Sequence, residues 1–220
     1  MLQCENTGIT LLLIMDTISM IQFNFLLIGA NITKMQEMLA DLVHLRPDEA
    51  RDPIISYQFS YKDILPLTSQ FFLATPVNYQ NVCGQWITSL HNVLFVFDVT
   101  NDKSFEALSP QLISKVSTEA GTNRLILVGY NASGGGASRI PRDKILLFAQ
   151  TIDFFYYFEV IPKSKFDFRA LFRRLIIENL IDFKQQFPEQ YQEEIKQARR
   201  AKLEIEKRAG EQVLDMKVKE

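Results

Sequence analysis

The hydrophobic pattern predicts four short buried strands, at residues 22–28, 92–98, 124–129 and 154–160. Each run is continuously apolar and rich in β-branched or aromatic side chains, whereas a half-exposed strand would alternate. Continuous apolarity is typical of strands covered on both faces, as in a parallel sheet. Helical patterns fall between and after these runs, at about residues 34–45, 102–118, 140–151 and 164–184.

Two weaker strands fit at residues 54–60 and 70–75, and they could pair antiparallel at one edge of the sheet. Strands that alternate with helices indicate right-handed crossovers, with helices on both faces of the sheet. The predicted fold class is therefore α/β: a three-layer domain with a mostly parallel, six-stranded sheet and a C-terminal helical extension.

Two breaks organise the chain. Residues 130–139 (YNASGGGASR) hold three consecutive glycines and indicate a loop. Pro188 ends the helix before it, because a proline inside a helix costs about 3 kcal/mol. We expect a lead-in over residues 1–21, a domain over 22–187, and a charged C-terminal helix and tail over 188–220.

The C-terminal helix carries a thin apolar stripe on a charged surface, formed by Tyr191, Ile195, Ala198, Ile205 and Ala209. Helices that pack firmly on their own domain usually have a wider apolar face. The stripe could dock on a partner protein, with charged flanks that pair as in a coiled coil. The alternative is a solvated helix that lies loosely on the core. We predict the docking role.

Composition excludes several classes of function. The 24 Lys and Arg residues nearly balance the 26 Asp and Glu residues, which gives no electrostatic footprint for nucleic acid. Two cysteines and two histidines are too few for a disulfide framework or a usual zinc site, so we expect no metal and a reducing compartment. Residues 8–28 are mostly apolar, but no Lys or Arg precedes Lys34. We therefore expect a lead-in and a buried strand there instead of a signal peptide or membrane span.

Residues 22–184 resemble the Ras and Rab small GTPases. The resemblance rests on FNFLLIG (23–29), VLFVFDVTNDKSFEAL (93–108), LILVG (125–129) and YFEVIPK (157–163). These stretches occur in the order and at roughly the spacing of that family. The resemblance implies a P-loop small-GTPase fold, with loops that would bind a guanine nucleotide and Mg²⁺.

The phosphate loop departs from the family pattern. A GTPase needs G-x-x-x-x-G-K-[ST], in which backbone N–H groups and the lysine meet the phosphates and the hydroxyl holds Mg²⁺. Gly29 matches the first position. Without a gap, Lys34 lies where the second glycine belongs and Met35 replaces the lysine. With a one-residue deletion Lys34 takes the lysine position, and Met35 then replaces the Mg²⁺-binding hydroxyl.

The switch positions depart as well. Ile54 stands where the first switch of the family carries a threonine. Thr75 stands where the second carries a Mg²⁺-supporting aspartate. Ile54 has no side-chain oxygen and Thr75 has no carboxylate, so both replacements remove the group that the metal site would use.

The guanine-reading motifs also differ. Asn131 lies one position late for N-K-x-D, and Ser133 cannot replace its carboxylate. In the last base-contact motif only Lys163 matches, because Pro162 has no N–H to donate.

These losses predict a pseudo-GTPase that keeps the fold without the nucleotide chemistry. Each charge-assisted hydrogen bond contributes about 1.5–3 kcal/mol. Three losses of roughly 2 kcal/mol would weaken nucleotide affinity by about four orders of magnitude. We expect no catalytic residue and no cofactor, with Gly29, Lys34, Asn131 and Lys163 as vestigial positions. The alternative is a divergent GTP-binding trafficking protein that retains nucleotide through unusual contacts.

The chain ends VLDMKVKE, without a prenylation motif or terminal cysteine pair, so we expect no lipid anchor. The leading hypothesis is a non-enzymatic structural subunit of a larger protein assembly. Rab-like proteins without lipid tails occur in ciliary and flagellar complexes. The resemblance therefore implies a cytoplasmic protein of a cilium, an axoneme or another cytoskeletal assembly.

Overall fold

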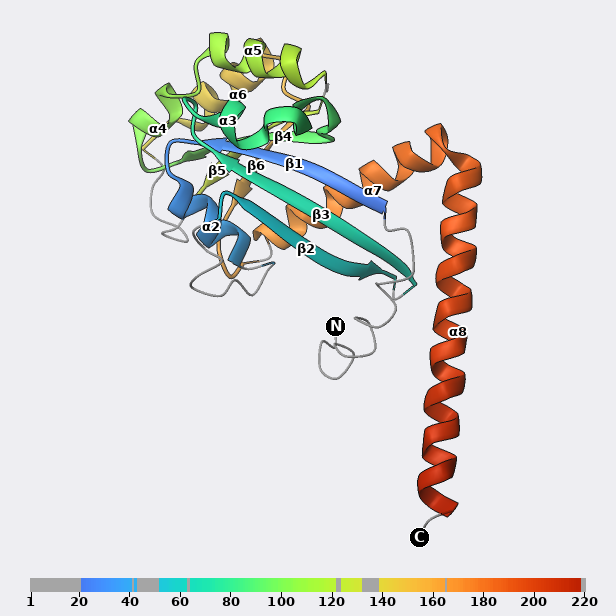
Figure 1. The fold of residues 1–220 in the computed structure, drawn as a ribbon. Coiled ribbons are helices and arrows are strands. Elements are labelled where there is room, and N and C mark those ends of the chain that lie inside the picture. Colours follow the sequence, from blue (N-terminus) through green and yellow to red (C-terminus); the bar gives the residue numbers. More distant parts are fainter. Residues whose placement is uncertain are drawn as a thin grey trace. The chain divides into compact units, whose positions relative to one another are not determined.

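Six strands form one sheet in the order β2-β3-β1-β4-β5-β6 (Figure 1). The computed structural model describes residues 21–40, 42, 52–62, 64–121, 124–131, 139–164 and 166–218. The strands are β1 (Ile21–Gly29), β2 (Ile54–Tyr61), β3 (Leu65–Ala74), β4 (Asn92–Asp98), β5 (Leu125–Tyr130) and β6 (Tyr156–Val160). All four strongly apolar runs and both weaker segments of the sequence are strands, which confirms the predicted six-stranded sheet.

The sheet is mostly parallel. β4 pairs in parallel with β1 and β5, and β6 pairs in parallel with β5. Strands β2 and β3 are neighbours that are joined only by residues 62–64. A parallel pair would need a connection of about a dozen residues or more, so β2 and β3 form an antiparallel hairpin at the edge. β3 begins five residues earlier than the segment 70–75 predicted, because Leu65 and Leu67 are also buried.

The helices follow the predicted alternation with strands. They are α2 (Ile32–Ala40), α3 (Tyr79–Cys83), α4 (Asp102–Glu106), α5 (Pro110–Ala120), α6 (Arg142–Thr151), α7 (Phe168–Gln186) and α8 (Pro188–Val218), with a 3₁₀ helix, η2 (Gly84–Ser89). The prediction of a single helix over 102–118 is wrong, because this segment forms two helices, α4 and α5. Ser109 caps α5 by accepting a hydrogen bond from the Leu112 amide (3.2 Å), and Pro110 lacks the N–H that would continue α4.

The chain divides into two compact units, one of residues 23–57 and 69–179 and the other of the described residues outside those ranges. The larger unit holds the parallel part of the sheet and helices α2 to α6. The smaller unit includes the β2–β3 turn and α8. We describe each unit by itself.

Helices cover both faces of the sheet in the larger unit, which confirms the three-layer fold. On one face, α3, α4, α5 and α6 pack on alternate strand residues such as Leu26, Phe95 and Leu127 (Figure 1). On the opposite face, the Phe25 and Phe71 rings stack at 5.2 Å between centroids. The α7 residues Phe168 and Phe172 pack on this pair, which closes a second, aromatic core.

The break at Pro188 is confirmed. α7 ends at Gln186, and Pro188 is the first residue of α8, where its missing N–H is tolerated. Most described side chains of α8 are exposed, as its charged sequence predicts. Within the described ranges, every helix is too short or too polar to cross a bilayer.

We predict that Phe71→Ala lowers the free energy of unfolding by about 3–5 kcal/mol, because it leaves a cavity in the aromatic core. Phe71 is fully buried, whereas Phe155 is 52% exposed. The matched control Phe155→Ala should therefore cost less than about 1 kcal/mol. Urea denaturation followed by circular dichroism measures both values, and equal losses would contradict the packing described.

Candidate functional site

A small pocket opens at the carboxyl ends of β1, β4 and β5, within the larger unit. Its volume is about 180 Å³. Its lining residues are Ala30, Asn31, Lys34, Val96, Phe97, Asp98, Asn101, Ser104 and Tyr130. β1 stands between β3 and β4 in the sheet, so the strand order reverses there, which is where open α/β sheets bind ligands. The pocket is nonetheless smaller than the roughly 300 Å³ at which small-molecule sites begin.

The connection from β1 to α2 is only two residues long. β1 ends at Gly29 and α2 begins at Ile32. The Asn31 side chain accepts a hydrogen bond from the Lys34 amide (3.2 Å), and the Asn31 carbonyl accepts one from Met35 (3.4 Å). Asn31 therefore caps α2 with its own side chain, and this occupies an amide of the kind that a phosphate loop presents to its ligand.

Gly29 is required here for packing. A Cβ atom at Gly29 would lie 2.8 Å from the Val96 carbonyl oxygen and 3.2 Å from the Met35 sulfur. Met35 itself is fully buried. Lys34 lines the pocket and Met35 faces the core, so the structure favours the alignment that places Lys34 in the lysine position.

The Lys34 ammonium forms an ion pair with Asp98 Oδ2 inside the pocket. Asp98 is only 8% exposed. Its other oxygen, Oδ1, accepts hydrogen bonds from the Thr100 amide (2.8 Å) and hydroxyl (2.6 Å). Both carboxylate oxygens are thus bonded, one to the first turn of α2 and one to the turn after β4.

This arrangement keeps Asp98 ionised. Burial by itself would raise the pKa of Asp98, but the hydrogen bonds from Lys34 and Thr100 outweigh it and hold the pKa below its usual value. Lys34, with 35% of its side chain exposed, is therefore held by a permanent negative charge at neutral pH.

The two switch positions are engaged in local turns. The Ile54 amide donates to Asp52 Oδ1 (2.8 Å) at the start of β2. The Thr75 amide and hydroxyl both donate to Asn78 Oδ1, at 2.7 and 2.9 Å. The Thr75 hydroxyl is therefore taken by a side-chain amide at the place where the family would support Mg²⁺.

The segment after Thr75 is fixed to α5. The Tyr79 hydroxyl donates to Glu119 Oε2 (2.8 Å), and Gln80 Nε2 donates to Glu119 Oε1 (2.8 Å). Burial, followed by the neighbouring Glu119 carboxylate, raises the pKa of Tyr79 well above its usual range. The tyrosine remains a neutral donor, which holds α3 against α5.

The residues that the resemblance would place on the guanine side do not line the pocket. Asn131 is buried and joins β5 to β6: its side-chain amide donates to Glu159 Oε1 (3.0 Å) and its backbone amide to the Val160 carbonyl (2.9 Å). Lys163 lies exposed in the turn after β6, with a positive φ of 57°. Ser133 lies outside the described residues.

The residues of the predicted stripe on α8 differ in how far their side chains are exposed. Ala198 is buried at 3% exposure, while Tyr191 and Ile195 are half-buried. The side chains of Ile205 and Ala209 lie outside those described. Leu203 is 65% exposed, and it shares one side of α8 with Ile195 because the two are eight residues apart.

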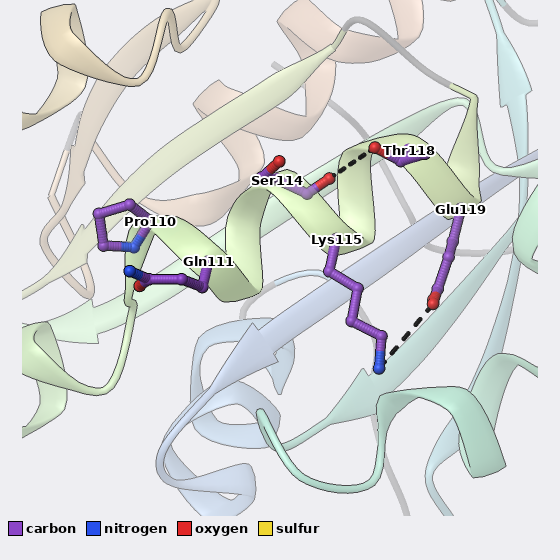
Figure 2. A pocket seen from close by; sticks show the side chains of 6 residues that line it. All are labelled: Pro110, Gln111, Ser114, Lys115, Thr118 and Glu119. Atoms are coloured by element: carbon purple, nitrogen blue, oxygen red, sulfur yellow. Dashed lines mark hydrogen bonds and ion pairs between the residues drawn. The ribbon is translucent and has the colours of Figure 1, made fainter.

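A second depression lies on α5, and Figure 2 shows its lining side chains. All six of them come from this one helix: Pro110, Gln111, Ser114, Lys115, Thr118 and Glu119. Lys115 and Glu119 approach to 4.0 Å, and the Thr118 hydroxyl donates to the Ser114 carbonyl. Since its lining comes from one helix face, and Glu119 is already bonded to Tyr79 and Gln80 of α3, the depression lacks the convergent free groups that a binding site needs.

Two pocket features were not predicted from the sequence. The sequence pattern places Asp98 at the end of an apolar strand and does not indicate a role for it. Tyr130, the last residue of β5, also lines the pocket, and the sequence pattern does not indicate this. The signal in the sequence is a carboxylate at the carboxyl end of a buried strand, followed by a hydroxyl two residues later at Thr100. Among the described residues, no group of three His, Cys, Asp or Glu side chains is placed to hold a metal ion.

Residues 74–182 match the family model of the Ras family. The matched stretch runs from the end of β3 into α7, so it contains Asp98 and begins after Gly29 and Lys34. The match supports a relationship to Ras-like small GTPases over this part of the chain, in agreement with the fold. No curated protein matches the chain.

We predict that the Lys34–Asp98 pair makes stability depend on acid pH. Because the folded protein lowers the pKa of Asp98, the pair contributes fully above the unfolded value of about 3.9 and is lost as pH falls through the lower folded value. Urea unfolding between pH 6 and pH 3 should show a steeper loss for the wild type than for Asp98→Asn. The control Asp102→Asn removes an exposed carboxylate nearby and should keep the wild-type slope. Parallel curves for Asp98→Asn and wild type would contradict the role of the pair.

Proposed function

We propose that this chain, whose residues 74–182 relate it to the Ras-like small GTPases, is a pseudo-GTPase that serves as a non-enzymatic interaction subunit. One observation supports this more than any other. The Lys34 ammonium, which would meet the β- and γ-phosphates, is paired with the buried carboxylate of Asp98.

The geometry around Lys34 also opposes phosphate binding. A phosphate loop wraps its ligand with several glycine-rich residues, whereas two residues connect β1 to α2 here. The amide of Lys34 is bonded to Asn31, and a phosphate would have to displace that cap. Binding a nucleotide in the manner of a phosphate loop, through backbone amides as well as the lysine, would therefore require both the ion pair and the helix cap to break.

The positions expected to hold Mg²⁺ offer no free oxygen. Met35 is buried in the core, and Ile54 has an apolar side chain. The Thr75 hydroxyl is bonded to Asn78. Without the metal, the charge that develops on a transferred phosphoryl group would have no stabilising cation, so we propose that the chain does not hydrolyse GTP.

A divergent GTP-binding trafficking protein is the second candidate. The observation that favours it is the position of the pocket, which lies at the reversal of strand order and retains one lysine. In that case Lys34 would leave Asp98 when the nucleotide binds. The two candidates differ in a measurable quantity, the affinity for GTP.

We propose α8 as the element through which the chain joins a larger protein assembly. One side of α8 carries Ile195, Arg199 and Leu203 at intervals of four residues, so an apolar pair flanks a cation there. Ala198 is buried, so it is not part of this exposed side. A ciliary or other cytoskeletal assembly is the proposed setting, and it is supported only by the resemblance to Rab-like proteins.

We expect millimolar GTP with Mg²⁺ to leave the melting temperature unchanged. A Kd below about 10 μM would add roughly 2.7 kcal/mol at a hundredfold ligand excess, which is a shift of several degrees. Differential scanning fluorimetry, with EDTA in place of Mg²⁺ as the control, makes the measurement. A Mg²⁺-dependent shift of that size would favour the trafficking candidate over the pseudo-GTPase.

Leu203→Glu should weaken incorporation into the native assembly at least tenfold, since it places a charge in the exposed apolar contact of α8. Val77→Glu is the matched control, because Val77 is 93% exposed and lies in the other unit. Tagged full-length chains, expressed in the native source, are compared by the amount of co-purifying complex. Equal recovery of the two variants would rule out this side of α8 as the attachment.

A further inference from the structure

We infer that Asp98 is an internal anion that occupies Lys34 in the place of an oxyanion ligand, and that removing its charge turns the pocket into a site for inorganic phosphate. The inference deepens the proposed function and rests on it. Asp98 blocks the pocket to anions by neutralising Lys34. Without that charge, Lys34 would bind small tetrahedral anions.

The pattern of bonds around Asp98 is that of a bound anion. Among the nine lining residues of the pocket, Lys34 is the cation and Asp98 the acid. The Asp98 carboxylate accepts from the Lys34 ammonium through one oxygen and from the Thr100 amide and hydroxyl through the other. A carboxylate and a phosphate use the same kinds of donor, which are an ammonium, a backbone N–H and a hydroxyl.

Two other polar side chains of the pocket, those of Asn101 and Ser104, bond the backbone of the chain. Asn101 Oδ1 accepts from the Lys103 amide (3.1 Å). The Ser104 hydroxyl accepts from the Asp98 amide (2.9 Å) and lies 2.7 Å from the Asn101 carbonyl. The charge that would attract an anion is therefore that of Lys34, and Asp98 is the group that neutralises it.

The size of the pocket selects the class of ligand. About 180 Å³ is several times the roughly 30 Å³ that one water molecule takes up in the liquid. It is also below the roughly 300 Å³ at which sites for larger small molecules begin. Inorganic phosphate or sulfate fits these limits, while a whole nucleotide does not.

The test uses the full chain and the substitution Asp98→Asn. Asparagine keeps an oxygen that can accept from Thr100 and removes the charge that holds Lys34. Thermal melts are recorded in potassium phosphate and in potassium chloride at the same ionic strength of about 0.15 M, which equalises screening. The controls are the wild type, the exposed-site variant Asp102→Asn, and the double variant Lys34→Met with Asp98→Asn.

We expect Asp98→Asn to melt below the wild type in chloride and to regain stability in phosphate, with a phosphate affinity at least tenfold above that of the wild type. The wild type and Asp102→Asn should melt alike in both salts, and the double variant should show no rescue. If Asp98→Asn folds and phosphate does not stabilise it, or if the double variant is rescued equally, the inference is overturned and the pseudo-GTPase proposal is unaffected.

Two other results would also decide between the proposals: failure of Asp98→Asn to fold, and stabilisation of the wild type by GTP. If Asp98→Asn does not fold in chloride, it and the smaller Asp98→Ser should be recovered folded when refolded in phosphate, and failure of both counts against the inference. If the wild type is itself stabilised by GTP and Mg²⁺, the proposed function fails, whatever the variants do with phosphate.

Discussion

The ion pair between Lys34 and Asp98 connects two elements that are far apart in the sequence. Lys34 belongs to the first turn of α2, while Asp98 ends β4 and also bonds the turn at Thr100. A buried carboxylate without its partner would be strongly destabilising, so the local geometry of both elements depends on the pair. The two-residue β1–α2 connection places Lys34 in the first turn of α2, within reach of Asp98.

Other loops at this edge of the sheet are closed in a similar manner, by their own side chains. Asn31 caps α2, Asn78 holds Thr75, and Asn131 joins β5 to Glu159 on β6. Each of these amides meets a backbone or side-chain group that would otherwise face the pocket edge or solvent. At these three described positions the hydrogen bonds are made within the chain, without a bound ligand.

Much of the fold could be predicted from the sequence, because continuous apolar runs can become only buried strands or buried helices, and their short length decides between these. The division of 102–118 into α4 and α5 was missed, although Ser109 and Pro110 carry a start signal for a new helix. The extent of β3 was missed for another reason: Thr68, Ser69 and Gln70 interrupt its apolar pattern, yet Thr68 and Ser69 are buried beside their neighbours in the sheet.

The sequence by itself determined the α/β class and the break at Pro188, and it predicted the loss of the ordinary phosphate, metal and guanine motifs, since each of these depends on residues that are neighbours in the chain. Only the tertiary structure decided what Lys34 does. Its partner Asp98 is 64 residues away, and the two meet because β1 and β4 pair in parallel and end at the same edge of the sheet. A contact of that kind depends on strand order and register, which local patterns do not encode.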